Sequence, residues 1–104
     1  MEVSPVPYVR LSIATPRRGD EARLATIMQQ LADAAASHPG CLESYVMRPH
    51  DESGEIARLA IYADEHSAVS TAGDEHMLAL RSQMHLVCEP GHIERAFFTV
   101  APGE

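Results

Sequence analysis

The chain has 104 residues, 45% of them hydrophobic, and a formal net charge of −7, which suits one folded domain with a single core. Eight arginines without any lysine supply no clustered basic surface and argue against nucleic-acid binding, and no apolar run approaches the roughly 20 residues of a membrane-spanning helix. The first residues lack the pattern of a secretory signal. We therefore expect a cytoplasmic protein with one domain over residues 1–104.

The first two predicted elements are a strand and a helix. Residues 8–15 (YVRLSIAT) alternate apolar and polar side chains, and this period of two is typical of a strand. Over residues 20–38 apolar side chains recur at intervals of three and four, which predicts an amphipathic helix. Pro39 lacks a backbone donor and Gly40 tolerates a positive φ, so the helix should end there.

The rest of the chain should form two more strands, a helical stretch and a last strand. Residues 41–48 (CLESYVMR) and 56–63 (IARLAIYA) flank a polar turn and should pair as an antiparallel hairpin. Helical sequence follows over residues 64–86, and residues 92–100 (HIERAFFTV) form a last strand. The order βαββαβ predicts an α+β, ferredoxin-like fold, with a four-stranded antiparallel sheet and helices on one face.

The second face of this sheet would then have no cover within the chain. Both alternating sets of strand residues contain apolar side chains, such as Tyr45 and Met47 against Leu42 and Val46. A solvated face would be more polar. We therefore predict a homodimer in which this face packs against a second copy.

The stretch DEHSAVSTAGDEH contains Asp-Glu-His twice. On one helix His66 and His76 would point about 80° apart and lie about 15 Å apart along the axis, too far to share a metal, so we predict no metal site. The preferred interpretation is two consecutive helix starts over residues 64–72 and 74–86, in which Asp64 and Asp74 are N-caps. His76 would then lie in a first turn, where the helix dipole favours the neutral imidazole and lets it act as a base.

Three segments resemble the antibiotic biosynthesis monooxygenase family, a group of dimeric α+β barrels. They are HPGCLESYVM, ARLAIYADEHSA and EHMLALRSQM, and the resemblance extends over about residues 8–100. It implies a homodimer with a small pocket in each subunit between sheet and helices. It also implies a cofactor-independent monooxygenase that oxidises a small aromatic or hydroquinone-type substrate with O₂, without flavin or metal.

The resemblance and the residue pattern together nominate site residues. His76 would be the base, and Tyr62, which stands where the family commonly has Trp, would donate to the developing oxyanion. Arg81 could hold a substrate oxygen one turn beyond His76, and Met77 follows His76 directly. The predicted substrate-binding residues are Arg10, Tyr45, Met77, Arg81 and Phe97.

Two alternatives stay open beside the oxygenase. Ordinary packing would also explain Met77 and the aromatic and arginine residues at the strand ends. In that case the chain is a non-catalytic dimeric barrel that binds a small hydrophobic metabolite. Haem degradation is the less favoured alternative, because relatives that degrade haem use an Asn, a Trp and a His, and this chain has neither Asn nor Trp.

Overall fold

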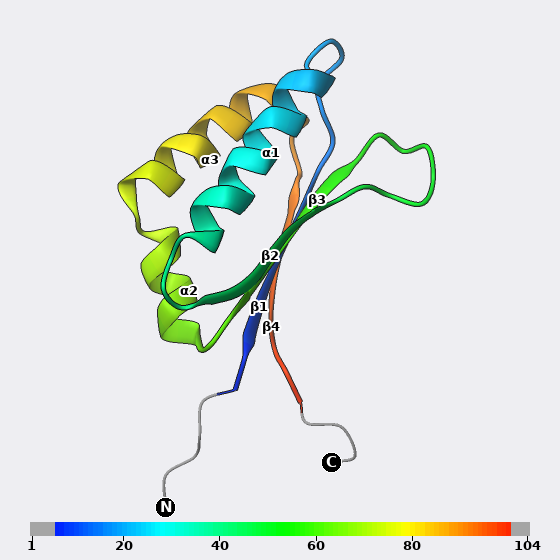
Figure 1. Ribbon diagram of the computed structural model, residues 1–104. Helices are drawn as coiled ribbons and strands as arrows, with labels where there is room; N and C mark the ends of the chain where they lie inside the picture. The colour runs from blue at the N-terminus through cyan, green and yellow to red at the C-terminus, as the bar shows by residue number, and fades with distance from the viewer. Residues whose placement is uncertain (1–5, 101–104) are drawn as a thin grey trace, which may run out of the picture.

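The structure is a computed structural model that describes residues 6–100. Its helices and strands form two layers, with the helices on one side of a single sheet (Figure 1). In chain order the elements are β1 (Tyr8–Ala14), α1 (Glu21–Ala36), β2 (Cys41–Met47), β3 (Ile56–Tyr62), α2 (Glu65–Ala72), α3 (Glu75–Val87) and β4 (Ile93–Phe98).

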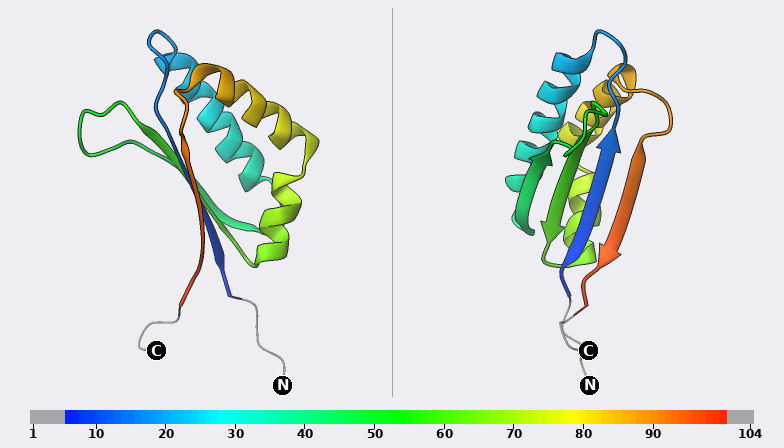
Figure 2. Two further views of the ribbon diagram at one scale, coloured as in Figure 1. Left: turned by 180° about the vertical axis from the view of Figure 1, so that it is seen from behind. Right: turned by 90° about the vertical axis from the view of Figure 1, so that its right-hand side faces the viewer.

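The sheet has four antiparallel strands in the order β2-β3-β1-β4, which Figure 2 shows face-on. The predicted ferredoxin-like fold is therefore confirmed. The hairpin of β2 and β3 is also as predicted, although a bulge between Cys41 and Glu43 shifts its register. No helix within residues 6–100 is long and apolar enough to cross a membrane.

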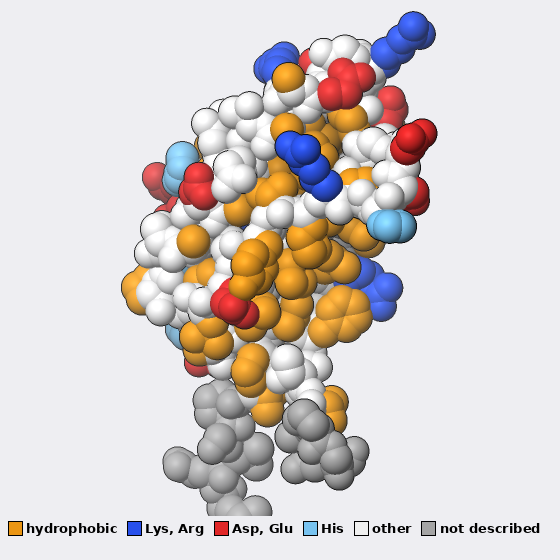
Figure 3. Space-filling model, turned by 45° about the vertical axis from the view of Figure 1, so that its right-hand side comes forward, with side chains coloured by type: hydrophobic (Ala, Val, Ile, Leu, Met, Phe, Trp, Pro, Cys, Tyr) orange, Lys and Arg blue, Asp and Glu red, His pale blue; other side chains and the backbone are white. Residues whose placement is uncertain are grey.

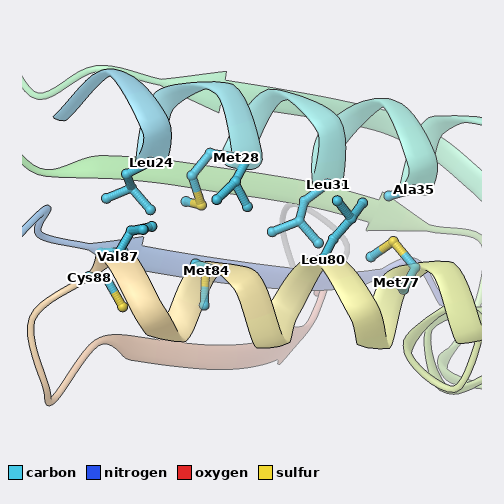
Figure 4. Packing of buried hydrophobic residues seen from close by; sticks show 11 residues of the cluster. Leu24, Met28, Leu31, Ala35, Met77, Leu80, Met84, Val87 and Cys88 are labelled. Carbon is cyan, nitrogen blue, oxygen red and sulfur yellow. The ribbon is translucent and has the colours of Figure 1, made fainter. Parts of the chain in front are cut away.

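The main core lies between α1 and α3. Their apolar stripes face each other as two rows of side chains above the sheet (Figure 4). Burial of such side chains contributes roughly 1.5–3 kcal/mol each, so this helix pair is anchored firmly. The two rows are Leu24, Ile27, Met28, Leu31 and Ala35 on α1, and Met77, Leu80, Met84 and Val87 on α3.

The repeated Asp-Glu-His marks two helix starts, as predicted. A carboxylate oxygen of Asp64 accepts from the backbone N–H of Ser67 at 2.8 Å. The Asp74 carboxylate accepts from the N–H groups of His76 and Met77 at 3.1 and 3.2 Å. Each aspartate thus satisfies N–H groups that a helix leaves unpaired in its first turn.

The sheet face away from the helices is rich in apolar side chains, which gather over the strands in Figure 3. The strand register places Leu11 opposite Leu59 and Val9 opposite both Ile61 and Phe97 on this face. Tyr45 and Phe97 remain 46% and 41% exposed there. We call this surface the outer face; its members on the strands are Val9, Leu11, Ile13, Glu43, Tyr45, Met47, Ala57, Leu59, Ile61, Ile93, Arg95 and Phe97.

Candidate functional site

A pocket of about 220 Å³ lies between the sheet and helices α2 and α3. Strands β1, β3 and β4 contribute its floor, and α2 and α3 contribute its wall. The pocket is separate from the α1–α3 core and shares only Met77 with it. It is lined by Arg10, Leu11, Ser12, Arg58, Tyr62, Ala68, Ala72, Met77, Arg81, Glu94, Arg95 and Ala96.

Strand register explains why this space is empty. Arg10 on the central strand β1 pairs with Ala60 of β3 on one side and with Ala96 of β4 on the other. The nearest helix contributes two more alanines, Ala68 and Ala72. Small side chains therefore flank Arg10 on the neighbouring strands and leave room beside it for a ligand.

The next row across the sheet carries charge. Ser12 of β1 pairs with Arg58 of β3 and with Glu94 of β4, so these three side chains lie side by side on the helix-facing side. Arg58 is diagonal to Arg10, and the backbones of two such positions on neighbouring strands are about 7–8 Å apart. The floor of the pocket thus holds two arginines at diagonal positions of one sheet face.

Both guanidinium groups have an unpaired donor. The Nε atoms of Arg10 and Arg58 are shut off from solvent and have no hydrogen-bond partner within the described residues. Arg58 as a whole is only 8% exposed, and its burial lowers the pKa of the guanidinium. A buried unpaired donor costs about 1–3 kcal/mol, more when the group is charged. Because the two Nε atoms are shut off from solvent, a ligand in the pocket would bind these guanidinium groups through their Nη atoms.

The carboxylate of Glu94 lies at the edge of the same pocket. It accepts from Arg81 Nη2 at 3.0 Å and from the hydroxyl of Ser12 at 3.4 Å. His92 Nε2 lies 3.5 Å from Glu94 Oε1, the same oxygen that accepts from Ser12. Glu94 is therefore engaged with Arg81, and its charge also acts on Arg58. It is the one carboxylate among the pocket-lining residues of the described chain, so the arginines share it.

The hydroxyl-bearing ring of Tyr62 closes the end of the pocket near α2. The side chain is 2% exposed, and burial raises the pKa of its hydroxyl, with the positive charge of Arg58 acting in the opposite direction. The phenol therefore stays protonated near neutral pH and can donate a hydrogen bond to a ligand.

The structure brings four of the seven predicted site residues to this pocket. Arg10, Tyr62, Met77 and Arg81 all line it. They come from β1, β3 and α3, which are far apart in sequence but are joined by the strand pairing and by the packing of α3 on the sheet.

His76 lies elsewhere. It is exposed at the start of α3 and lines a separate hollow with His38 at the end of α1 and Thr71 at the end of α2. The neighbouring Met77 points inward while His76 points outward, because successive helical residues are turned by about 100°. His76 and Tyr62 thus do not share a pocket.

Tyr45 and Phe97 also lie away from the pocket, on the outer face. Tyr45 pairs with Leu59 and Phe97 with Val9, whereas most of the strand residues that line the pocket belong to the alternate set of β1, β3 and β4. The hydroxyl of Tyr45 donates to Glu43 at 2.7 Å on that surface. Neither side chain reaches the space in which a ligand would sit.

Sequence reasoning missed the other lining residues of the pocket, among them the charged Arg58 and Glu94. A signal existed for both. Arg58 interrupts the apolar run IARLAIY, and Glu94 falls on the same alternating set of its strand as Ala96. A charged residue on the buried face of a strand calls for a partner or a ligand.

The pocket can therefore hold a small anion or a polar ring. Within residues 6–100 no three His, Cys, Asp or Glu side chains gather closely enough to hold a metal ion. The groups that converge are guanidinium, phenol and carboxylate, which can bind an oxyanion, donate a hydrogen bond to it and take up a proton.

Comparison with known structures finds close likeness in fold at low sequence identity. Rv0793 from Mycobacterium tuberculosis is 14% identical over 94% of this chain and 99% of its own, with a TM-score of 0.84. PA3566 from Pseudomonas aeruginosa is 14% identical over 96% and 100%, with a TM-score of 0.82. SnoaB from Streptomyces nogalater, a cofactor-independent oxygenase, is 14% identical over 95% and 99%, with a TM-score of 0.80.

Among curated proteins no sequence match was found. The family model described as antibiotic biosynthesis monooxygenase matches residues 8–83. This range covers most of the chain, from β1 to the middle of α3, and includes Arg10, Arg58, Tyr62 and Arg81. Together with the fold, this match shows that the chain belongs to the antibiotic biosynthesis monooxygenase family.

Proposed function

We propose that the protein is a cofactor-independent monooxygenase that oxidises a small phenol or hydroquinone-type aromatic in the pocket between the sheet and helices α2 and α3. The observation that carries this proposal is the convergence of the buried Tyr62 hydroxyl with the Arg10 and Arg58 guanidinium groups in one pocket. Family membership and the fold shared with an oxygenase of this kind support it.

The first chemical step would be ionisation of the substrate hydroxyl. The two guanidinium groups favour the phenolate over the phenol, and the protonated Tyr62 donates to its oxygen. Preorganised donors of this kind stabilise developing charge most strongly where water is excluded. An electron-rich phenolate is then the reductant, which removes the need for a flavin or a metal.

The oxidation itself balances without a further reactant. The phenolate gives one electron to O₂, and the resulting ring radical and superoxide combine to form a carbon–oxygen bond. Loss of the proton on that ring carbon breaks the peroxide O–O bond. One oxygen atom remains as the new quinone carbonyl, and the other leaves as water with the two protons released from the substrate.

A proton acceptor is needed, and the geometry favours Glu94 over His76. Glu94 lines the pocket and lies next to Ser12 and Arg81. His76, which the sequence nominated, opens onto another hollow. We therefore propose that Glu94 accepts the substrate proton, and we use His76 as the control residue.

Two matched variants test this assignment. Glu94→Gln keeps the shape of the side chain and removes the base, and loss of a positioned base typically lowers a rate by about 10² to 10⁴. His76→Ala should leave turnover unchanged, because the imidazole lies outside the pocket. The measurement is O₂ consumption with phenols of one to three rings, together with incorporation of ¹⁸O from ¹⁸O₂ into the quinone.

Other outcomes have definite meanings. If His76→Ala abolishes turnover and Glu94→Gln does not, the base is His76 and the reacting site is not this pocket. If the wild-type protein consumes no O₂ with any phenol, the oxygenase proposal fails. A protein that only binds a small metabolite would then be the better description.

We also propose that the protein is a homodimer joined through the outer face. The apolar strand residues of that face, with Tyr45 and Phe97 half exposed, support this proposal. Tyr45 and Phe97 would then belong to the interface. Their contribution to the site would be to hold the sheet that forms the pocket floor.

A further inference from the structure

The pair Arg10 and Arg58 is the least satisfied part of the molecule. Two positive groups lie diagonally on one sheet face, each with a buried Nε that lacks a hydrogen-bond partner within residues 6–100. Burial disfavours the charge of Arg58, as the direction of its pKa shift shows. An arrangement of this kind is stabilised by an anion that accepts from both guanidinium groups.

The protein supplies one carboxylate near this pair, Glu94, whose negative charge acts on Arg58. Among the described residues that line the pocket, Glu94 is the one carboxylate, and it is bound to Arg81 at 3.0 Å. The guanidinium carbon of Arg10 lies 5.8 Å from the centre of the Tyr8 ring, a contact that brings no negative charge to Arg10. The arginines that line the pocket thus outnumber its one carboxylate, and the balancing negative charge must come with the ligand.

From this geometry we infer that the ligand of the pocket carries a carboxylate, held between Arg10 and Arg58, on a single aromatic ring. The inference rests on the proposed function in that it names the substrate class of the same pocket. A guanidinium group presents two parallel donors that match the two oxygens of a carboxylate. A phenolate oxygen alone would satisfy fewer of the donors.

The size of the pocket favours one ring. A cavity of about 150 Å³ holds a benzene molecule, and this pocket measures about 220 Å³. The difference accommodates a carboxylate and one or two hydroxyl groups. A molecule of three fused rings would have to leave part of its surface outside the pocket.

The ring would lie beside small side chains. Ala60 and Ala96 flank Arg10 on the sheet, and Ala68 and Ala72 form the wall on α2. With the carboxylate on the arginine pair, the ring extends toward Tyr62 at one end of the pocket. The phenol of Tyr62 can then donate to a ring hydroxyl, which is the oxygen that the oxidation requires.

The test compares two ligands of the same shape. Binding of 2,5-dihydroxybenzoate and of its neutral amide, 2,5-dihydroxybenzamide, is measured by calorimetry without oxygen, so that no turnover is needed. We expect the acid to bind wild-type protein at least tenfold more tightly than the amide. Equal affinities, or no binding of either compound, overturn the inference.

Variants locate the effect. Arg58→Met and Arg10→Met should each weaken binding of the acid at least tenfold and leave binding of the amide unchanged. Arg23→Met is the matched control, because Arg23 is 72% exposed on α1 and far from the pocket. A loss of acid binding in the control, or none in both pocket variants, contradicts the assignment.

The comparison remains interpretable if a variant folds poorly. The contrast between acid and amide uses the wild-type protein alone, and thermal unfolding of Arg58→Met shows whether that variant is folded. Oxygenase activity is measured separately. Preference for the acid without O₂ consumption would support the carboxylate site and refute the proposed oxidation. Equal turnover of acid and amide would support the oxidation and refute the carboxylate site.

Discussion

Single residues in this molecule have roles set by which side of a strand or helix they occupy. Tyr62 and Ile61 are neighbours in sequence, yet Tyr62 closes the pocket while Ile61 lies on the outer face. His76 and Met77 divide in the same way at the start of α3. A change of one position therefore separates a possible catalytic group from a surface group.

Asp64 illustrates a residue whose role is structural and pH-dependent. Hydrogen bonds from Ser67 lower the pKa of its carboxyl group below the ordinary 3.8. A lowered folded-state pKa means that the cap stabilises the protein above the unfolded pKa, and that this stability is lost as the pH falls through the folded value. Asp64→Ala should thus be destabilising at pH 7, with a difference from wild type that shrinks toward pH 3.

The matched control is Asp20→Ala. Asp20 precedes α1 as its N-cap, but its side chain makes no capping hydrogen bond, so its loss should matter less at pH 7. Both variants are compared with wild type by urea unfolding over the pH range. A difference for Asp64→Ala that stays constant with pH would show that the carboxylate is not what stabilises the start of α2.

At the scale of elements, local pattern was sufficient for most of the fold. The alternation in residues 8–15 and the apolar stripe over residues 20–38 gave β1 and α1, because each needs only its own sequence to be recognised. Gly73 and the second aspartate divided the later helical stretch into α2 and α3. These signals are short-range, and the sequence contains them in full.

The pocket could be predicted only in part, because it depends on strand register. Arg10 and Tyr62 were nominated, but Arg58 and Glu94 become pocket residues through pairing with Ser12 on both sides of β1. No local pattern fixes which residues of β3 and β4 stand opposite Ser12. For the same reason Tyr45 and Phe97 could not be assigned to a face of the sheet.

The turn between α1 and β2 positions the helix that forms the pocket wall. Gly40 lies against Ser67 at the start of α2, and a β-carbon on Gly40 would overlap the Ser67 side chain. The carbonyl of Gly40 also accepts from Ala63 at 2.9 Å. Gly40→Ala should therefore push α2 away from β2 and lower the free energy of unfolding by about 1–3 kcal/mol, a usual cost of overpacking.

Gly73→Ala is the control for that substitution. Gly73 ends α2 in an ordinary helical conformation, and an added β-carbon would make only normal contacts. It should be neutral or stabilising by about 0.4–1 kcal/mol, because alanine has less freedom in the unfolded chain. Denaturant unfolding compares the two; equal destabilisation would show that close approach to Ser67 is not the reason for glycine at position 40.

At the scale of the whole molecule, the pocket is locally positive although the chain as a whole is acidic. The chain carries a net charge of −7, whereas the pocket is lined by four arginines, Arg10, Arg58, Arg81 and Arg95, and by one carboxylate, Glu94. A positive pocket in an acidic protein favours a small anion at that site. The surface as a whole repels large polyanions, which agrees with the absence of a basic patch in the sequence.

The outer face leads to the last prediction. Leu59 lies on β3, an interior strand of the sheet, and pairs with Leu11 and Tyr45 on that face. In a homodimer joined through this surface, Leu59→Asp would bury a charge without a partner, which is strongly unfavourable. The variant should therefore be monomeric at micromolar concentration, where sedimentation velocity of the wild type should give twice the monomer mass.

Leu86→Asp introduces the same charge on α3, where the side chain is already 73% exposed, and should leave the dimer intact. A wild-type protein that sediments as a monomer, or a Leu59→Asp variant that remains dimeric while Leu86→Asp does not, would place the interface elsewhere.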